Sequence, residues 1–134
     1  MNYWLVKSEP ESYSWQLFVK EGRAVWDGVR NYEARNNLSK MKTGDKVLYY
    51  HSNKGKEIVG IAQVIRESYP DPTTTDSRWV AVDLIPVEEL KKSITFEQIK
   101  TNSVLKNILL VKQTRLSVMP LKKEEFEIIC ELGK

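Results

Sequence analysis

The stretch KVLYYHSNKGKEIVGIAQVI, residues 46–65, holds two strand patterns with a turn between them. Lys46 to Ser52 is apolar on both faces, which is typical of a strand inside a closed sheet. Ile58 to Ile65 is rich in β-branched residues, and Gly60 within it indicates a bend or a close backbone approach. Asn53 to Gly55 supplies the turn. The stretch therefore predicts two strands of a strongly bent sheet.

The residues before this stretch predict one strand and two helices. Pro10 ends the strand because it cannot donate to a ladder. Ser14 can cap the first helix and Gly22 can stop it, and the second helix has apolar residues at the i, i+4 and i+7 spacing of a buried stripe. The predicted strand covers residues 3–7, and the helices cover residues 14–21 and 31–41.

The residues after it predict a surface loop at 69–76, followed by three more strands and two helices. Thr95 and Gln98 form a capping box that opens the first of these helices. The expected strands are 79–87, 108–112 and 115–119, and the expected helices are 95–100 and 122–132. Five or six strands with about four helices predict an α+β fold, a small, mixed but mostly antiparallel β-barrel flanked by the helices.

Composition limits both the class of protein and its chemistry. A chain of 134 residues with 41% hydrophobic and 29% charged residues is expected to form one folded domain, residues 1–134. Cys130 and His51 are the only residues of their types, so we expect no metal, no disulfide within the chain and a reducing compartment, the cytoplasm. We expect neither a membrane span nor a signal peptide.

Positive charge is concentrated in two segments. The net charge is only +3, but Gln98 to Lys123 contains six basic residues and no acid, and Lys20 to Lys56 contains nine basic residues against four acids. Aromatic residues are interleaved with the second group, which suits a surface that holds phosphates and stacks bases. A solvated face beside an aromatic core explains the same composition equally well.

The sequence lacks the residues that several familiar catalytic mechanisms require. No glycine-rich phosphate loop of the Walker or Rossmann kind is present, and a Ser-His-carboxylate triad would depend on His51 without the sharp turn that exposes a nucleophile. We therefore assign no catalytic residue and expect no cofactor.

Three polar clusters remain as candidate sites. Trp26 to Asn31 offers a stacking ring, a flexible glycine and multi-donor side chains, although a tryptophan is more often simply part of the core. Tyr50 to Asn53 lies at a strand end, where a histidine is more often structural. In Arg115 to Pro120, alternation places Arg115 and Ser117 on one face, toward either a pocket or water.

These clusters belong to a set of motifs whose order resembles the EVE domain family over nearly the whole chain. The motifs are Tyr3 to Pro10, Tyr13 to Trp15, Trp26 to Tyr32, Ala34 to Leu38, Gly44-Asp45, Tyr50 to Asn53, Tyr69 to Pro72 and Arg115 to Pro120. The resemblance implies a PUA-like fold, shared with YTH and ASCH domains. It also implies a pocket that binds nucleic acid, DNA or RNA, through a modified base, with modified cytosine favoured. No departure from the family pattern stands out.

The resemblance assigns the pocket residue by residue. The implied pocket residues are Lys7, Ser8, Trp26, Val29, Arg30, Asn31, Tyr50, His51, Ser52, Arg115 and Ser117. Within the two basic segments, we expect phosphate contacts from Arg35, Lys42, Lys106 and Lys112. We expect a monomer.

Two alternatives from other classes stay open at this point. Related ASCH domains include amidohydrolases, and Lys7 with Glu9 could activate water on a modified nucleoside. A protein-interaction module is the second alternative, and its binding would show little of the salt dependence that phosphate contacts produce.

Overall fold

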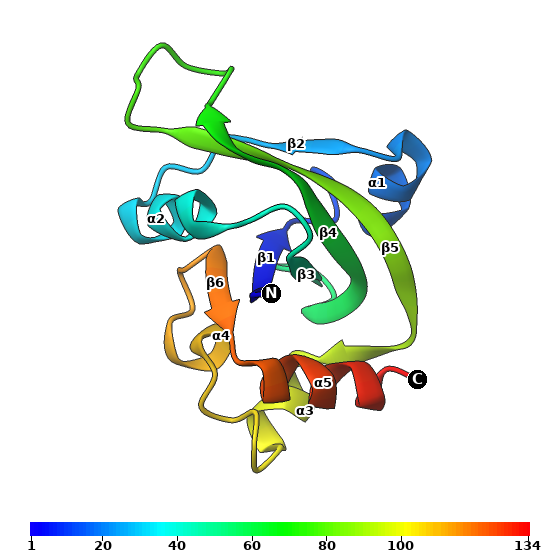
Figure 1. Ribbon diagram of the computed structural model, residues 1–134. Coiled ribbons are helices and arrows are strands. Elements are labelled where there is room, and N and C mark those ends of the chain that lie inside the picture. The colour runs from blue at the N-terminus through cyan, green and yellow to red at the C-terminus, as the bar shows by residue number, and fades with distance from the viewer.

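A computed structural model describes all 134 residues and folds them around one six-stranded sheet of order β2-β5-β4-β3-β1-β6 (Figure 1). The strands are β1 Tyr3–Ser8, β2 Ala24–Trp26, β3 Lys46–His51, β4 Glu57–Pro70, β5 Val80–Thr95 and β6 Val118–Leu121. The helices are α1 Trp15–Glu21, α2 Tyr32–Lys40, α3 Phe96–Thr101, α4 Leu109–Lys112 and α5 Lys123–Leu132.

The sheet is mixed and strongly curved. Only β1 and β3 run parallel, and every other neighbouring pair is antiparallel. The long strands β4 and β5 bend together around the other strands (Figure 1), and the register shifts along their ladder are the bulges that allow the bend. The predicted fold class is thereby confirmed. No helix of the structure is both long and apolar enough to cross a membrane.

Gly60 of β4 lies directly against the ring of Trp15. Gly60 pairs with Tyr49 on β3, next to a shift in the register. A side chain at Gly60 would place its Cβ 2.5 Å from ring atoms of Trp15, so the indole occupies the space above the glycine. The predicted close approach at Gly60 is confirmed, and the group that approaches is an aromatic ring.

An aromatic cluster at the centre of the barrel fixes α1 on the sheet. The rings of Phe18 and Tyr49 stack with centroids 5.3 Å apart, and Trp15 meets Tyr49 edge-on at 5.4 Å. Both ends of α1 are capped as expected, because Ser14 accepts from the Leu17 N–H and Gly22 takes up a left-handed conformation. The α1 segment is thus held against β3 and β5.

One element differs from its predicted type, one differs in its bounds, and one was not predicted. The apolar run at 108–112, expected as a strand, is the helical turn α4, because a run this short carries no decisive periodicity. The expected strand at 115–119 begins only at Val118. The strand β2 has three residues, too few for a pattern, and is defined by its pairing with β5.

The observed bounds of the two long strands also differ from the predicted ones. β4 continues to Pro70, so Tyr69 and Pro70 belong to the strand and the projecting loop begins at Asp71. β5 continues to Thr95, past Pro86, which lies inside the strand beside a register shift. The structure has five helices where about four were expected.

Replacing Gly60 by alanine should destabilise the fold by about 2 kcal/mol, because the new methyl group overlaps the buried Trp15 ring. The free energy of unfolding, measured in urea, checks this expectation. The matched control is the same substitution in a Trp15→Phe background, where the smaller ring should reduce the additional cost of Gly60→Ala. An equal cost in both backgrounds would refute the contact as the cause.

Candidate nucleic-acid interface

A cavity of about 630 Å³ lies beside the end of β1, the strand β2 and the segment that leads from β2 into α2. This volume is within the range of about 300–1,000 Å³ typical of small-molecule sites. Its lining residues are Lys7, Ser8, Tyr13, Glu21, Arg23, Ala24, Val25, Trp26, Asp27, Gly28, Val29, Arg30, Asn31 and Ser117. We call it the first cavity.

Trp26 is the aromatic residue best placed for a ligand in the first cavity. It is the last residue of β2 and is only partly buried. Its ring meets Tyr49 nearly perpendicularly at 5.6 Å and Tyr13 at 6.4 Å. The indole is therefore anchored on the aromatic core and still lines the cavity, so it can act as a fixed stacking surface.

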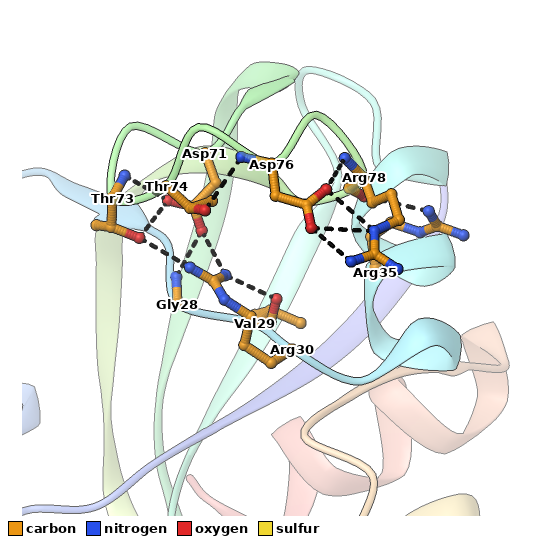
Figure 2. A network of polar contacts seen from close by, with 9 residues as sticks. All are labelled: Gly28, Val29, Arg30, Arg35, Asp71, Thr73, Thr74, Asp76 and Arg78. Atoms are coloured by element: carbon orange, nitrogen blue, oxygen red, sulfur yellow. Dashed lines mark hydrogen bonds and ion pairs between the residues drawn. The ribbon is translucent and has the colours of Figure 1, made fainter.

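The wall that follows Trp26 is fixed by the buried carboxylate of Asp71. Figure 2 shows this carboxylate beside Gly28, Arg30 and Thr73. It accepts from the Gly28 N–H at 2.8 Å and from Arg30 Nη1 at 2.9 Å, and also from the Thr73 N–H at 2.7 Å and its hydroxyl at 2.6 Å. The loop after β4 thereby holds the cavity wall in place.

This network also determines the charge of Asp71. Burial alone would raise the pKa of the carboxyl, but the hydrogen bonds from Thr73, Arg30 and Gly28 outweigh it and hold the pKa well below the ordinary 3.8. Asp71 is ionised at neutral pH and balances the charge of Arg30, whose side chain is 41% exposed.

Arg30 and Asn31 differ in what they leave free for a ligand. The guanidinium of Arg30 is engaged by Asp71, by the Thr73 hydroxyl at 3.0 Å and by the Val29 carbonyl at 3.0 Å. The Oδ1 atom of Asn31 caps α2 by accepting from the Ala34 N–H at 2.9 Å. The Nδ2 group of Asn31 makes no hydrogen bond in the protein and can donate to a ligand.

The remaining ionisable groups bring both positive and negative charge to the first cavity. Burial lowers the pKa of Lys7, whose Nζ donates to the Thr114 carbonyl at 2.9 Å. Tyr13 donates to Glu21 at 2.6 Å, and its burial together with that carboxylate raises its pKa. Burial and the nearby Asp71 raise the pKa of Asp27. The cavity can therefore offer a cation, carboxylates and a neutral phenol to a polar ligand edge.

The structure brings seven of the predicted pocket residues to the first cavity and places four elsewhere. The seven are Lys7, Ser8, Trp26, Val29, Arg30, Asn31 and Ser117. Tyr50 and Ser52 line a second cavity, and Arg115 lines a third hollow. His51 is buried, and its Nε2 accepts from the Trp15 N–H at 3.1 Å. The histidine therefore has a structural role, which was the alternative to a role in the site.

Seven residues of the first cavity were missed by sequence reasoning. They are Tyr13, Glu21, Arg23, Ala24, Val25, Asp27 and Gly28. Asp27 and Gly28 lie inside the predicted Trp26 cluster, and Tyr13 lies in one of the family motifs. For the segment from Glu21 to Val25 the sequence held no signal, because its place at the cavity depends on the long-range pairing of β2 with β5.

The four residues predicted to contact phosphate lie on the surface in different settings. Arg35 donates to Asn36 Oδ1 at 2.8 Å and to the Arg78 carbonyl at 3.1 Å. Lys42 lies 3.9 Å from the Glu67 carboxylate. Lys106 and Lys112 are exposed and make no ion pair, so their charge is available to a partner.

Lys7 and Glu9 are not paired. Glu9 is exposed and lines neither of the two larger cavities, whereas the Lys7 ammonium is directed to a backbone carbonyl. No cluster of three or more His, Cys, Asp or Glu side chains with the geometry of a metal site occurs in the structure.

The curved six-stranded sheet with its flanking helices is a PUA-like domain. A YTH domain from Zygosaccharomyces rouxii has the same fold, with a TM-score of 0.63 at 15% identity over 99% of this chain and 86% of that one.

Residues 2–132 match the family model described as the EVE domain. Thymocyte nuclear protein 1 of Mus musculus is 38% identical, over 98% of this chain and 73% of that protein. A solved structure from Rhodopseudomonas palustris is 45% identical with a TM-score of 0.95, covering 99% of this chain and 93% of that one. Human THYN1, in complex with DNA containing 5-methylcytosine, is 32% identical with a TM-score of 0.92, covering 100% and 98%. The chain belongs to the EVE domain family.

Stability should fall as the pH is lowered from about 7.5 to about 5, because burial lowers the pKa of His51 below its ordinary 6.5. The unfolded chain then binds a proton that the folded chain resists, since protonated Nε2 can no longer accept from Trp15. Urea unfolding at several pH values measures this loss. His51→Gln removes the only histidine and should flatten the profile, and an unchanged slope would contradict the assignment.

Asp71→Asn should lower the free energy of unfolding by about 2–3 kcal/mol at neutral pH, the range for losing charged hydrogen bonds at a buried group. Because the folded pKa is depressed, the difference from the wild type should shrink as the pH falls below the ordinary 3.8. Asp76→Asn is the control, since its carboxylate bonds only within its own loop. A loss equal to that of the control would refute the clamp.

Proposed function

We propose that this protein reads a modified base in nucleic acid, with modified cytosine in DNA favoured and RNA as the other candidate strand. The observation that carries the proposal is the first cavity itself, which has an anchored indole at one side and a free amide donor on Asn31. The complex of human THYN1, a relative of the same family, with DNA containing 5-methylcytosine supports it.

The energetics define how such a reader would work. Taking a base out of the stack costs a few kcal/mol. Stacking on Trp26 offsets about 1–3 kcal/mol of that cost. An apolar recess rewards one added methyl group by only about 1 kcal/mol. We therefore expect modest discrimination by the recess alone, and stronger discrimination where a polar group of the modification also finds a hydrogen bond.

Lysine and arginine side chains outside the cavity would hold the phosphates. The exposed residues Lys106 and Lys112 suit this role because no carboxylate neutralises them. Their contribution is independent of the base sequence, whereas that of the first cavity depends on the base. We expect the protein to act as a monomer and as one domain, and its composition favours the cytoplasm.

Trp26→Ala should abolish the preference for a modified strand, because the stacking surface is lost. Lys106→Ala should weaken modified and unmodified strands alike, by about the same factor, and reduce the salt dependence. Fluorescence anisotropy with matched labelled oligonucleotides, with and without 5-methylcytosine and at two salt concentrations, measures both effects. Thermal unfolding confirms that each variant is folded.

Equal losses on both strands from both variants would overturn this division of roles. Salt-sensitive binding by the wild type with no preference for either strand would leave only a general nucleic-acid binder. Absence of binding would refute the proposed function altogether.

A further inference from the structure

A second cavity of about 440 Å³ lies between the turn that joins β3 to β4 and the start of α3. Lys7 lines this cavity as well as the first, so the two cavities adjoin at that side chain. None of the other residues of the second cavity lines the first. A ligand that extends out of the first cavity past Lys7 would enter this space.

The second cavity is predominantly cationic. Lys7, Lys56 and Lys100 line it, and Glu97 is its only carboxylate. Glu97 lies 3.4 Å from Lys100, with both side chains at least half exposed, so solvent screens that pair. Lys56 makes no ion pair in the structure. This surplus of positive charge suits a phosphodiester.

Phe96 gives the same cavity a flat apolar surface. The ring packs against the core and is partly buried, with the ammonium of Lys100 5.8 Å from its centroid. The Phe96 N–H donates to the Lys56 carbonyl at 2.8 Å. This bond joins the start of α3 to the turn at Lys56, whose backbone has a left-handed conformation, φ 44°, that a lysine seldom adopts. The backbones that carry the aromatic ring and the lysine are thus held next to each other.

We infer that the second cavity holds the nucleotide next to the base read in the first cavity. Its base stacks on Phe96, Lys56 and Lys100 contact its phosphate, and Lys7 contacts the phosphate that joins the two nucleotides. The Lys7 ammonium has two N–H groups left after its bond to Thr114. This inference rests on the proposed function and assigns the second cavity affinity without base selectivity, because every base has a stacking face.

The test compares Lys56→Asn/Lys100→Gln with the wild type. Asparagine tolerates the left-handed backbone at 56, so the double variant removes two charges from exposed positions without adding strain. The probes are a short single strand with one 5-methylcytosine, its unmodified counterpart and the free 5-methylcytosine mononucleotide. Lys91→Gln/Lys92→Gln is the charge-matched control, since both lysines are exposed and lie outside the two cavities.

We expect the double variant to bind both strands about tenfold more weakly at low salt, with a shallower salt dependence. The ratio of modified to unmodified affinity and the binding of the mononucleotide should stay as in the wild type. Phe96→Leu, which keeps an apolar side chain against the core, should weaken both strands by about fivefold or more through lost stacking. The control double variant should lose much less.

The outcomes separate this inference from the proposed function. Strand affinities at the level of the control, with selectivity still lost in Trp26→Ala, would overturn the second cavity's role alone. A changed modified-to-unmodified ratio in Lys56→Asn/Lys100→Gln would also overturn it, because the second cavity would then take part in reading the base. A wild type that binds neither strand would overturn both proposals.

Discussion

The ring of Tyr49 connects the core of the barrel to the first cavity. It is fully buried on β3, stacks on Phe18 and makes T-shaped contacts with Trp15 and Trp26. Its hydroxyl donates to the Tyr13 carbonyl at 2.7 Å, and burial raises its pKa to about 12, so the donor proton stays in place at all ordinary pH. Displacing this one side chain would loosen α1, β2 and the stacking surface of the site together.

The glycine opposite Tyr49 on β4 explains how several aromatic rings fit around Tyr49. Gly60 is its partner on β4, and the absence of a side chain there opens the space that Trp15 fills. The backbone of Trp15 is bound in turn by His51, two residues after Tyr49 on the same strand. The chain thus uses its only histidine as a structural acceptor, which places that ring outside the first cavity.

Local patterns predicted the elements that carry their own signal, and pairing over long distances determined the rest. The capped helices and the bend at Gly60 followed from single residues or short motifs. β2 could not be predicted, because three residues show no period and only the ladder to β5 makes them a strand. For the site, the contiguous Trp26 cluster was recognisable in the sequence. The hydrogen bonds of Asp71 join residues about forty positions apart, and no pattern in the sequence predicts them.

In the proposed reader, the two cavities separate selectivity from affinity along one path past Lys7. The two arginines of the first cavity are engaged, Arg30 by Asp71 and Arg23 by Asp83. In the proposal its contribution to a ligand therefore comes from the ring of Trp26 and from polar groups that bond the edge of the base. The second has Lys56 without an ion pair, Lys100 paired only with the exposed Glu97, and a ring suited to stack on any base. A reader needs both, because one methyl group contributes too little free energy to hold a strand by itself, whereas phosphate contacts hold every strand alike.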